Sequence, residues 1–160
     1  MRLLSPSYLG MSHDLFKKMA EKACPFIRDS LGAKVSTLEP GYMEMRLPFK
    51  EEFIGNPVTR VLHGGVTAAI LDHVGGFAAM SSIPEGKTLM STVDLRVDYV
   101  RPAKAEEMWC EGRVTSRNKT MIRADVTCWN PDKTKVIATA RGLYNSYKSD
   151  IEMYEAAENL

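Results

Sequence analysis

The stretch GGVTAAILDHVGGFAAM, residues 64–80, decides the fold that we expect. Apolar side chains occupy nearly every direction around a helix drawn through it, which predicts a helix buried on most sides. A carboxylate, Asp72, stands in the middle of this run. An aspartate taken out of water needs a partner or a shifted pKa, so Asp72 is predicted to serve a function. The alternative is a buried structural carboxylate that accepts hydrogen bonds from backbone N–H groups.

His63, Gly64 and Gly65 stand at the start of this helix. The first N–H groups of a helix have no intrahelical acceptor, and the helix dipole is positive there. Glycines let a ligand approach these N–H groups, and a carbonyl oxygen that becomes an oxyanion would be stabilised by them. In the alternative interpretation, His63 is a loop residue that only caps the helix.

Gly64 and Asp72 are eight residues apart, which is about 12 Å along a helix axis. Two groups of one chain at that separation cannot both contact the same reacting atom. If both act on one substrate, they must come from two chains. A twofold dimer with antiparallel helices would place Gly64 of each chain near Asp72 of the other and create two equal sites.

The segments around this helix predict an antiparallel sheet. Residues 14–30 have the spacing of an amphipathic helix interrupted at Pro25, and residues 34–49 alternate as a hairpin that turns at Pro40 and Gly41. Residues 50–62 lack a sustained period and are predicted to be a loop. Four strands joined by short turns are predicted after the helix, at residues 89–100, 106–115, 120–129 and 135–147. Residues 150–160 would form a short polar helix or fray.

A sheet with one apolar face needs a cover, and the helix at residues 64–80 is the only wholly apolar one. We therefore expect an α+β fold in which a curved antiparallel sheet wraps around a long central helix. The chain length of 160 residues suits one domain. Its expected parts are a helical extension at about 1–33, a core at about 34–147 and a tail at 148–160.

Composition excludes several classes of protein. Lys and Arg number 21 against 20 Asp and Glu, so no net field would draw the chain to nucleic acid. No stretch is long enough to span a membrane, and the N-terminus lacks a secretory segment, so a soluble cytoplasmic protein is expected. The three cysteines have no zinc-ligand pattern and are expected to be reduced structural thiols. His63, Asp72 and His73 are spread around the helix, so we expect no metal.

The run His63-Gly64-Gly65, with Asp72 nine positions after the histidine, is followed by the strand TVDLRVDYVRPA at residues 92–103. Together with Asn56 in the preceding loop, this pattern resembles the hotdog-fold thioesterases of the PaaI-like group. That group includes bacterial phenylacetyl-CoA thioesterases and mammalian thioesterase superfamily member 2. The resemblance spans residue 56 to about residue 141 and implies the hotdog fold.

The resemblance also implies roles for single residues. The Gly64 N–H would polarise the thioester carbonyl, and Asn56 and His63 would shape and orient that site. Asp72 of the partner subunit would act as the nucleophile or as the general base on water. Thr92 falls where relatives carry a hydroxyl that holds the attacking water.

Other residues are candidates for binding the substrate. Gly65 lies beside the expected oxyanion site, and Arg101, Arg117 and Lys119 lie near predicted strand ends where their charges could meet the phosphates of coenzyme A. For any one of the three, the ordinary exposure of Lys and Arg favours the alternative of a solvated turn residue. Arg60 departs from the family pattern, because many relatives have glycine at or near its place in the loop.

Two functions of different class follow. The first is an acyl-CoA thioesterase that acts as a homodimer or as a homotetramer (a dimer of dimers), with coenzyme A as part of the substrate and no other cofactor. A single carboxylate and oxyanion stabilisation suffice for a thioester, whose thiolate is a good leaving group. The alternative is a non-catalytic acyl-CoA-binding or regulatory hotdog protein. A hydratase of the same fold fits the residues less well.

Overall fold

The computed structural model describes residues 11–83 and 88–148. Helix α1 spans His13–Lys22, a π-helical turn follows at Phe26–Leu31, and the long helix α2 spans Gly64–Ser81. The strands are β1 (Lys34–Glu39), β2 (Tyr42–Leu47), β3 (Ile54–Asn56), β4 (Val61–Leu62), β5 (Thr88–Tyr99), β6 (Met108–Arg117), β7 (Met121–Trp129) and β8 (Val136–Lys148). The predicted tail at residues 150–160 lies outside the described residues.

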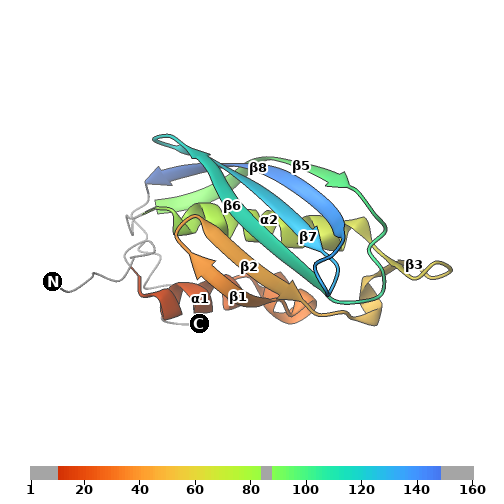
Figure 1. The fold of residues 1–160 in the computed structure, drawn as a ribbon. Helices are drawn as coiled ribbons and strands as arrows, with labels where there is room; N and C mark the ends of the chain where they lie inside the picture. The colour runs from red at the N-terminus through yellow and green to blue at the C-terminus, as the bar shows by residue number, and fades with distance from the viewer. Residues whose placement is uncertain (1–10, 84–87, 149–160) are drawn as a thin grey trace.

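Six of these strands form one antiparallel sheet in the order β1-β2-β6-β7-β8-β5. The sheet curves over α2, with β1 at one edge and β5 at the other (Figure 1). The expected α+β architecture of an antiparallel sheet around a long helix is therefore confirmed. The first predicted hairpin is also confirmed, and Gly41 supplies the positive φ, +76°, that its turn requires.

The prediction of a structureless loop at residues 50–62 is wrong. A 3₁₀ turn at Glu51–Phe53 leads into β3, which pairs with β4 as a small separate hairpin. In Figure 1 this hairpin projects beyond the end of the main sheet. Strands of two and three residues are too short to show a period of two, so the sequence pattern could not reveal them.

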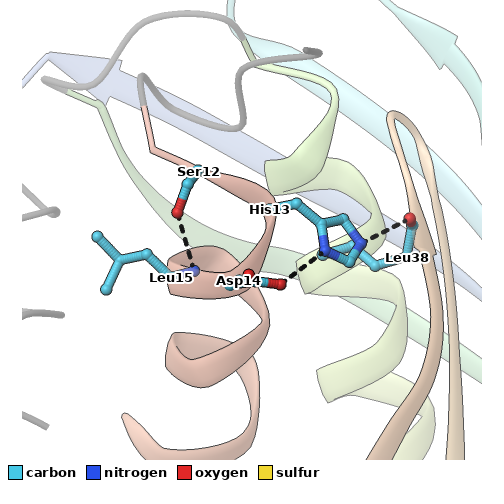
Figure 2. Close-up of polar contacts among 5 residues, drawn as sticks. All are labelled: Ser12, His13, Asp14, Leu15 and Leu38. Carbon is cyan, nitrogen blue, oxygen red and sulfur yellow. Dashed lines mark hydrogen bonds and ion pairs between the residues drawn. The ribbon is translucent and has the colours of Figure 1, made fainter.

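Two contacts hold the start of helix α1. The Ser12 side chain accepts a hydrogen bond from the Leu15 N–H, at 3.2 Å, and so caps the helix. His13 Nε2 lies 3.3 Å from the Leu38 carbonyl oxygen, which links α1 to β1 (Figure 2). The break predicted at Pro25 is also present, because the π-helical turn begins directly after it.

Helix α2 is buried on most sides as its sequence predicts, with nine buried residues. No helix in the described residues is long and apolar enough to cross a membrane.

Gly75 leaves room for a side chain of the sheet, that of Tyr144 on β8. A Cβ at Gly75 would lie 2.3 Å from the Tyr144 hydroxyl oxygen, and one at Gly142 would meet the same oxygen at 2.3 Å. The buried Tyr144 ring fits between helix and sheet because both glycines lack a side chain.

Two adjacent glycines of α2 should respond oppositely to alanine. We expect Gly75→Ala to lower the free energy of unfolding by about 1–3 kcal/mol, because the added methyl overlaps the immobile Tyr144. Gly76→Ala should raise it by about 0.5–1 kcal/mol, because its Cβ would lie 3.5 Å from Tyr144, an ordinary contact, and alanine favours a helix. Urea titration measures both. A stabilised Gly75→Ala would contradict this account of the packing.

The expectation of reduced cysteines is wrong for two of the three. Cys110 on β6 and Cys128 on β7 face each other in register and form a disulfide, with Cα atoms 4.1 Å apart. Cys24 is a free thiol. A separation of 18 residues along the chain gives no indication of this pairing, which depends on the register of two neighbouring strands.

Candidate active site

Asp72 lies in the middle of α2 and is half-buried. Its Oδ1 accepts a hydrogen bond from the Thr92 hydroxyl of β5, at 3.0 Å. Burial raises the pKa of the Asp72 carboxyl above its ordinary value, and the hydrogen bond from Thr92 opposes that shift. The Tyr144 hydroxyl donates to the backbone carbonyl of Asp72, at 3.3 Å, and so supports the helix at this point. The sequence prediction that Asp72 and Thr92 share a site is consistent with this contact.

A cavity of about 170 Å³ opens beside Asp72, between α2 and β5. Asp72 and Thr92 supply polar atoms at its wall, and apolar side chains from α2, β5 and β8 supply much of the rest. A carboxylate at the edge of an apolar cavity, with a pKa raised by burial, is an arrangement suited to accepting a proton or attacking a carbonyl carbon.

The start of α2 is organised by His63. Its Nδ1 accepts a hydrogen bond from the Gly65 N–H, at 3.0 Å, so the neutral ring carries its proton on Nε2. A Cβ at Gly65 would lie 2.9 Å from the same nitrogen, which is why this position suits glycine. The capping interpretation of His63 describes this contact, and the Gly65 N–H is already used in the cap.

Of the first three N–H groups of α2, that of Gly64 is the one left without an acceptor in the described residues. The next two N–H groups bond to His63. Gly64 lines a second cavity, of about 560 Å³. The Tyr99 hydroxyl of β5 donates to the Gly64 carbonyl, at 3.0 Å, and holds the first turn in place. The geometry therefore leaves an unpaired N–H at the positive end of a helix, beside a cavity.

Asn56 and Arg60 belong to the small hairpin that flanks this second cavity. Asn56 Oδ1 accepts from the N–H groups of Val58 and Thr59, at 3.0 and 3.1 Å, and thereby shapes the turn. Arg60 has a φ of +53°, a conformation that favours glycine. Its guanidinium forms an exposed ion pair with Glu51, at 2.7 Å.

The three basic residues predicted to meet phosphates are not brought together within one chain. Arg101 lines the cavity beside Gly64 and donates to the Val136 carbonyl, at 2.9 Å. Arg117 donates to the Ser82 carbonyl at the other end of α2, and Lys119 is exposed in the turn after β6. Arg101 is therefore the one placed beside the candidate oxyanion site.

Sequence reasoning missed two tyrosines of the site. Tyr99 was recognised only as part of an alternating strand, and its hydroxyl instead reaches the first turn of α2. The sequence pattern assigns Tyr144 only to a strand, yet its hydroxyl donates to the backbone carbonyl of Asp72. Their contacts join residues 35 and 72 positions apart, so no local pattern indicates them.

Two half-sites lie along β5, which is an edge strand: Asp72 with Thr92, and Gly64 with Tyr99. Thr92, near the middle of this strand, contacts Asp72, and Tyr99, its last residue, contacts Gly64. In the part of the chain that the structure describes, the outer edge of β5 has no strand partner. The half-sites are about 12 Å apart along α2, too far for both to reach one atom.

The fold and these half-sites define a class of proteins, hotdog-fold hydrolases. Residues 60–137 match the family model of the thioesterase superfamily. A Saccharolobus solfataricus protein provisionally named an esterase is 31% identical over 71% of this chain and 74% of its own length. The Escherichia coli medium/long-chain acyl-CoA thioesterase YigI is 28% identical over 75% of this chain and 84% of its own.

A solved structure shows the same fold. The Escherichia coli PaaI protein from the phenylacetic acid degradation operon superposes with a TM-score of 0.69, covering 83% of this chain and 95% of that one. Because its sequence is only 17% identical, this likeness establishes the shared fold and nothing about function. The chain belongs to the thioesterase superfamily, and the resemblance to its PaaI-like, hotdog-fold members is confirmed. This membership supports a hydrolase that cleaves thioesters.

Proposed function

We propose that the protein is an acyl-CoA thioesterase that hydrolyses a thioester to a free carboxylic acid and coenzyme A. The observation that carries the proposal is the pair of half-sites along β5: an unpaired Gly64 N–H beside Tyr99 at the end of the strand and the Asp72 carboxyl beside Thr92 near its middle. Each supplies one of the two things that thioester hydrolysis needs, a donor for the developing oxyanion and a base or nucleophile.

Two copies of the chain complete each site. Pairing of two β5 edges in antiparallel fashion, about a twofold axis between Thr92 and Tyr99, sets Asp72 of one copy beside Gly64 of the other. The edge is suited to this contact, because Val93 and Tyr99 of β5 are 53 and 57% exposed and Val100, directly after the strand, is 50% exposed, which is unusual for apolar side chains. The resulting homodimer can associate further into a tetramer.

In the proposed mechanism the thioester carbonyl oxygen accepts a hydrogen bond from the Gly64 N–H. Asp72 of the partner subunit takes a proton from water as the water oxygen attacks the carbonyl carbon, or it attacks that carbon itself and forms an anhydride that water then cleaves. In both routes the C–S bond breaks, the acyl group leaves as the acid, and the thiolate of coenzyme A takes up a proton. Thr92 holds the reacting carboxylate, or the water beside it.

Recognition of coenzyme A is proposed on the chemistry of the Gly64 cavity and on the relatives. The Arg101 guanidinium beside this cavity can bind phosphate oxygens. The name of YigI as an acyl-CoA thioesterase supports the same substrate class. The chain also contains no G-x-S-x-G motif that would indicate a serine hydrolase.

Release of thiol from a panel of acyl-CoAs tests the function directly. The purified protein is mixed with acetyl-, hexanoyl-, phenylacetyl- and palmitoyl-CoA, and free thiol is followed with a chromogenic disulfide. We expect catalytic release, many turnovers per chain, from at least one member. Saturable binding of an acyl-CoA without turnover would instead establish the non-catalytic binding protein.

A further inference from the structure

The cavity beside Asp72 has walls from three elements. Gly76 and Met80 of α2 lie one and two turns beyond Asp72, Met90 comes from β5, and the Tyr144 ring comes from β8. These walls are apolar, and the carboxyl and hydroxyl groups of Asp72 and Thr92 belong to the same lining. An apolar group joined to a carbonyl beside Asp72 would therefore enter next to Gly76 and run toward Met80.

The dimensions of this cavity limit what can enter. Its volume is about 170 Å³, and a dry apolar cavity of about 150 Å³ is enough to hold a six-carbon ring such as benzene. The distance from Asp72 to Met80 is about 12 Å along the helix axis, since eight residues separate them. Such a space suits a short or medium acyl group, and the rest of a long fatty chain would lie outside it.

We infer that this cavity is the acyl subsite, that it accepts an apolar acyl group of about six carbons, linear or aromatic, and that Gly76 and Met90 set its depth. The inference rests on the proposed function. A Cβ at Gly76 would point into the space between Tyr144 and Met90, 3.5 Å from the Tyr144 ring and 4.0 Å from Met90 Cε. Any longer side chain at Gly76 must therefore occupy this space, and removal of the Met90 thioether must enlarge it.

Helix α1 keeps the wall of the cavity in place. His73, beside Asp72, donates from Nε2 to the Ala20 carbonyl of α1, at 2.8 Å. Phe77, one turn further, contacts Phe16 of α1 edge to face, with ring centroids 5.8 Å apart. Both His73 and Phe77 also line the cavity. These two contacts tie the cavity-bearing face of α2 to α1.

The His73 ring is suited to this role because it stays neutral. Burial lowers its pKa to about 4, and the hydrogen bond to Ala20 offsets part of that shift. The Phe77 ring packs against it, with centroids 4.6 Å apart, and the nearest carboxyl along the chain is Asp72. At neutral pH the contact between α1 and α2 therefore involves no charged histidine, and it does not compete with Asp72 for protons.

The experiment measures kcat/KM for linear acyl-CoAs from two to sixteen carbons and for phenylacetyl-CoA. We expect the wild type to prefer hexanoyl over acetyl, because each buried methylene contributes about fourfold, and to gain nothing beyond about eight carbons. Gly76→Leu should lower the ratio of kcat/KM for hexanoyl-CoA to kcat/KM for acetyl-CoA at least tenfold. The kcat/KM for phenylacetyl-CoA should fall to the same extent as that for hexanoyl-CoA. Met90→Ala should move the preferred length upward by two or more carbons.

Matched variants separate cavity size from general damage. Gly76→Ala adds only a methyl at contact distance and should lower the ratio less than Gly76→Leu does. Met121→Ala removes a half-buried methionine of β7 that does not line the cavity and should leave the length profile unchanged. Because the measure is a ratio of substrates for each variant, partial unfolding cancels.

The outcomes distinguish this inference from the proposed function. No turnover of any acyl-CoA by the wild type would overturn the function itself. Turnover with a preference for palmitoyl-CoA, or with a length profile that Gly76→Leu and Met90→Ala leave unchanged, would overturn the acyl subsite while the thioesterase stands. Opposite shifts in the two variants support the subsite, and equal activity with hexanoyl- and phenylacetyl-CoA supports its tolerance of either shape.

Discussion

Asp72→Asn is expected to lower kcat/KM for thiol release by roughly 100-fold or more on the best acyl-CoA of the panel. The amide keeps the shape of the carboxyl and its oxygen can still accept from Thr92, so the change removes the base or nucleophile and little else. Steady-state kinetics measures the loss. Size-exclusion chromatography should give the same elution for both proteins. Turnover equal to wild type would show that Asp72 is structural.

The same substitution should stabilise the fold, with a particular pH dependence. Burial raises the native pKa of Asp72 above its ordinary value of 3.8, so the native state holds this proton more tightly than the unfolded state does. The ionised carboxylate therefore destabilises the protein above the native pKa, and this cost disappears as the pH falls below 3.8. Asp72→Asn should have the higher Tm at pH 8 and lose the advantage in acid.

The pH dependence of wild-type activity should report the ionisation of Asp72. Asp72 must be ionised to act, so kcat/KM should fall as the pH decreases through its raised pKa. The fall in kcat/KM on the acid side of the pH profile is expected at higher pH than for an exposed aspartate, because burial raises the pKa of Asp72. A rate independent of pH down to 4 would contradict the assignment of Asp72 as base or nucleophile.

Gly64→Pro is expected to reduce kcat by about 10²–10³, the usual cost of losing one oxyanion donor. Proline removes the N–H, and the first position of a helix accepts proline. The preceding His63 already has an extended ψ of 130°, which a residue before proline requires. Gly64→Ala keeps the N–H, although its Cβ lies 3.3 Å from the Tyr99 ring, so it should retain more activity.

A mixture of two inactive variants should regain activity. When Asp72→Asn and Gly64→Pro chains are coexpressed and assemble at random, half of the dimers contain one chain of each kind. In such a dimer one site unites the intact Gly64 with the intact Asp72 and the other carries both changes. The expected activity is about one quarter of wild type. If the mixture stays as inactive as its components, the sites are not shared between chains.

Much of the architecture could be read from local pattern. The apolar run at residues 64–80 predicted α2, because a helix surrounded by the sheet is apolar on most sides. Strands β5 to β8 were predicted within a few residues, because alternation and turn residues are short-range signals. The small hairpin β3–β4 and the Cys110–Cys128 disulfide were not predicted, since a two-residue strand has no period and cross-strand register is not local.

The sequence by itself determined which chemical groups are available: the carboxylate at Asp72, the glycines before the helix and the eight-residue spacing that separates them. The tertiary structure alone decided their surroundings. It brought Thr92 onto Asp72, used the Gly65 N–H in the cap by His63, left the Gly64 N–H unpaired and placed Gly76 and Met90 on one cavity. The physical reason is distance along the chain: helix spacing acts over a few residues, whereas burial and pKa depend on strands that pack from far away.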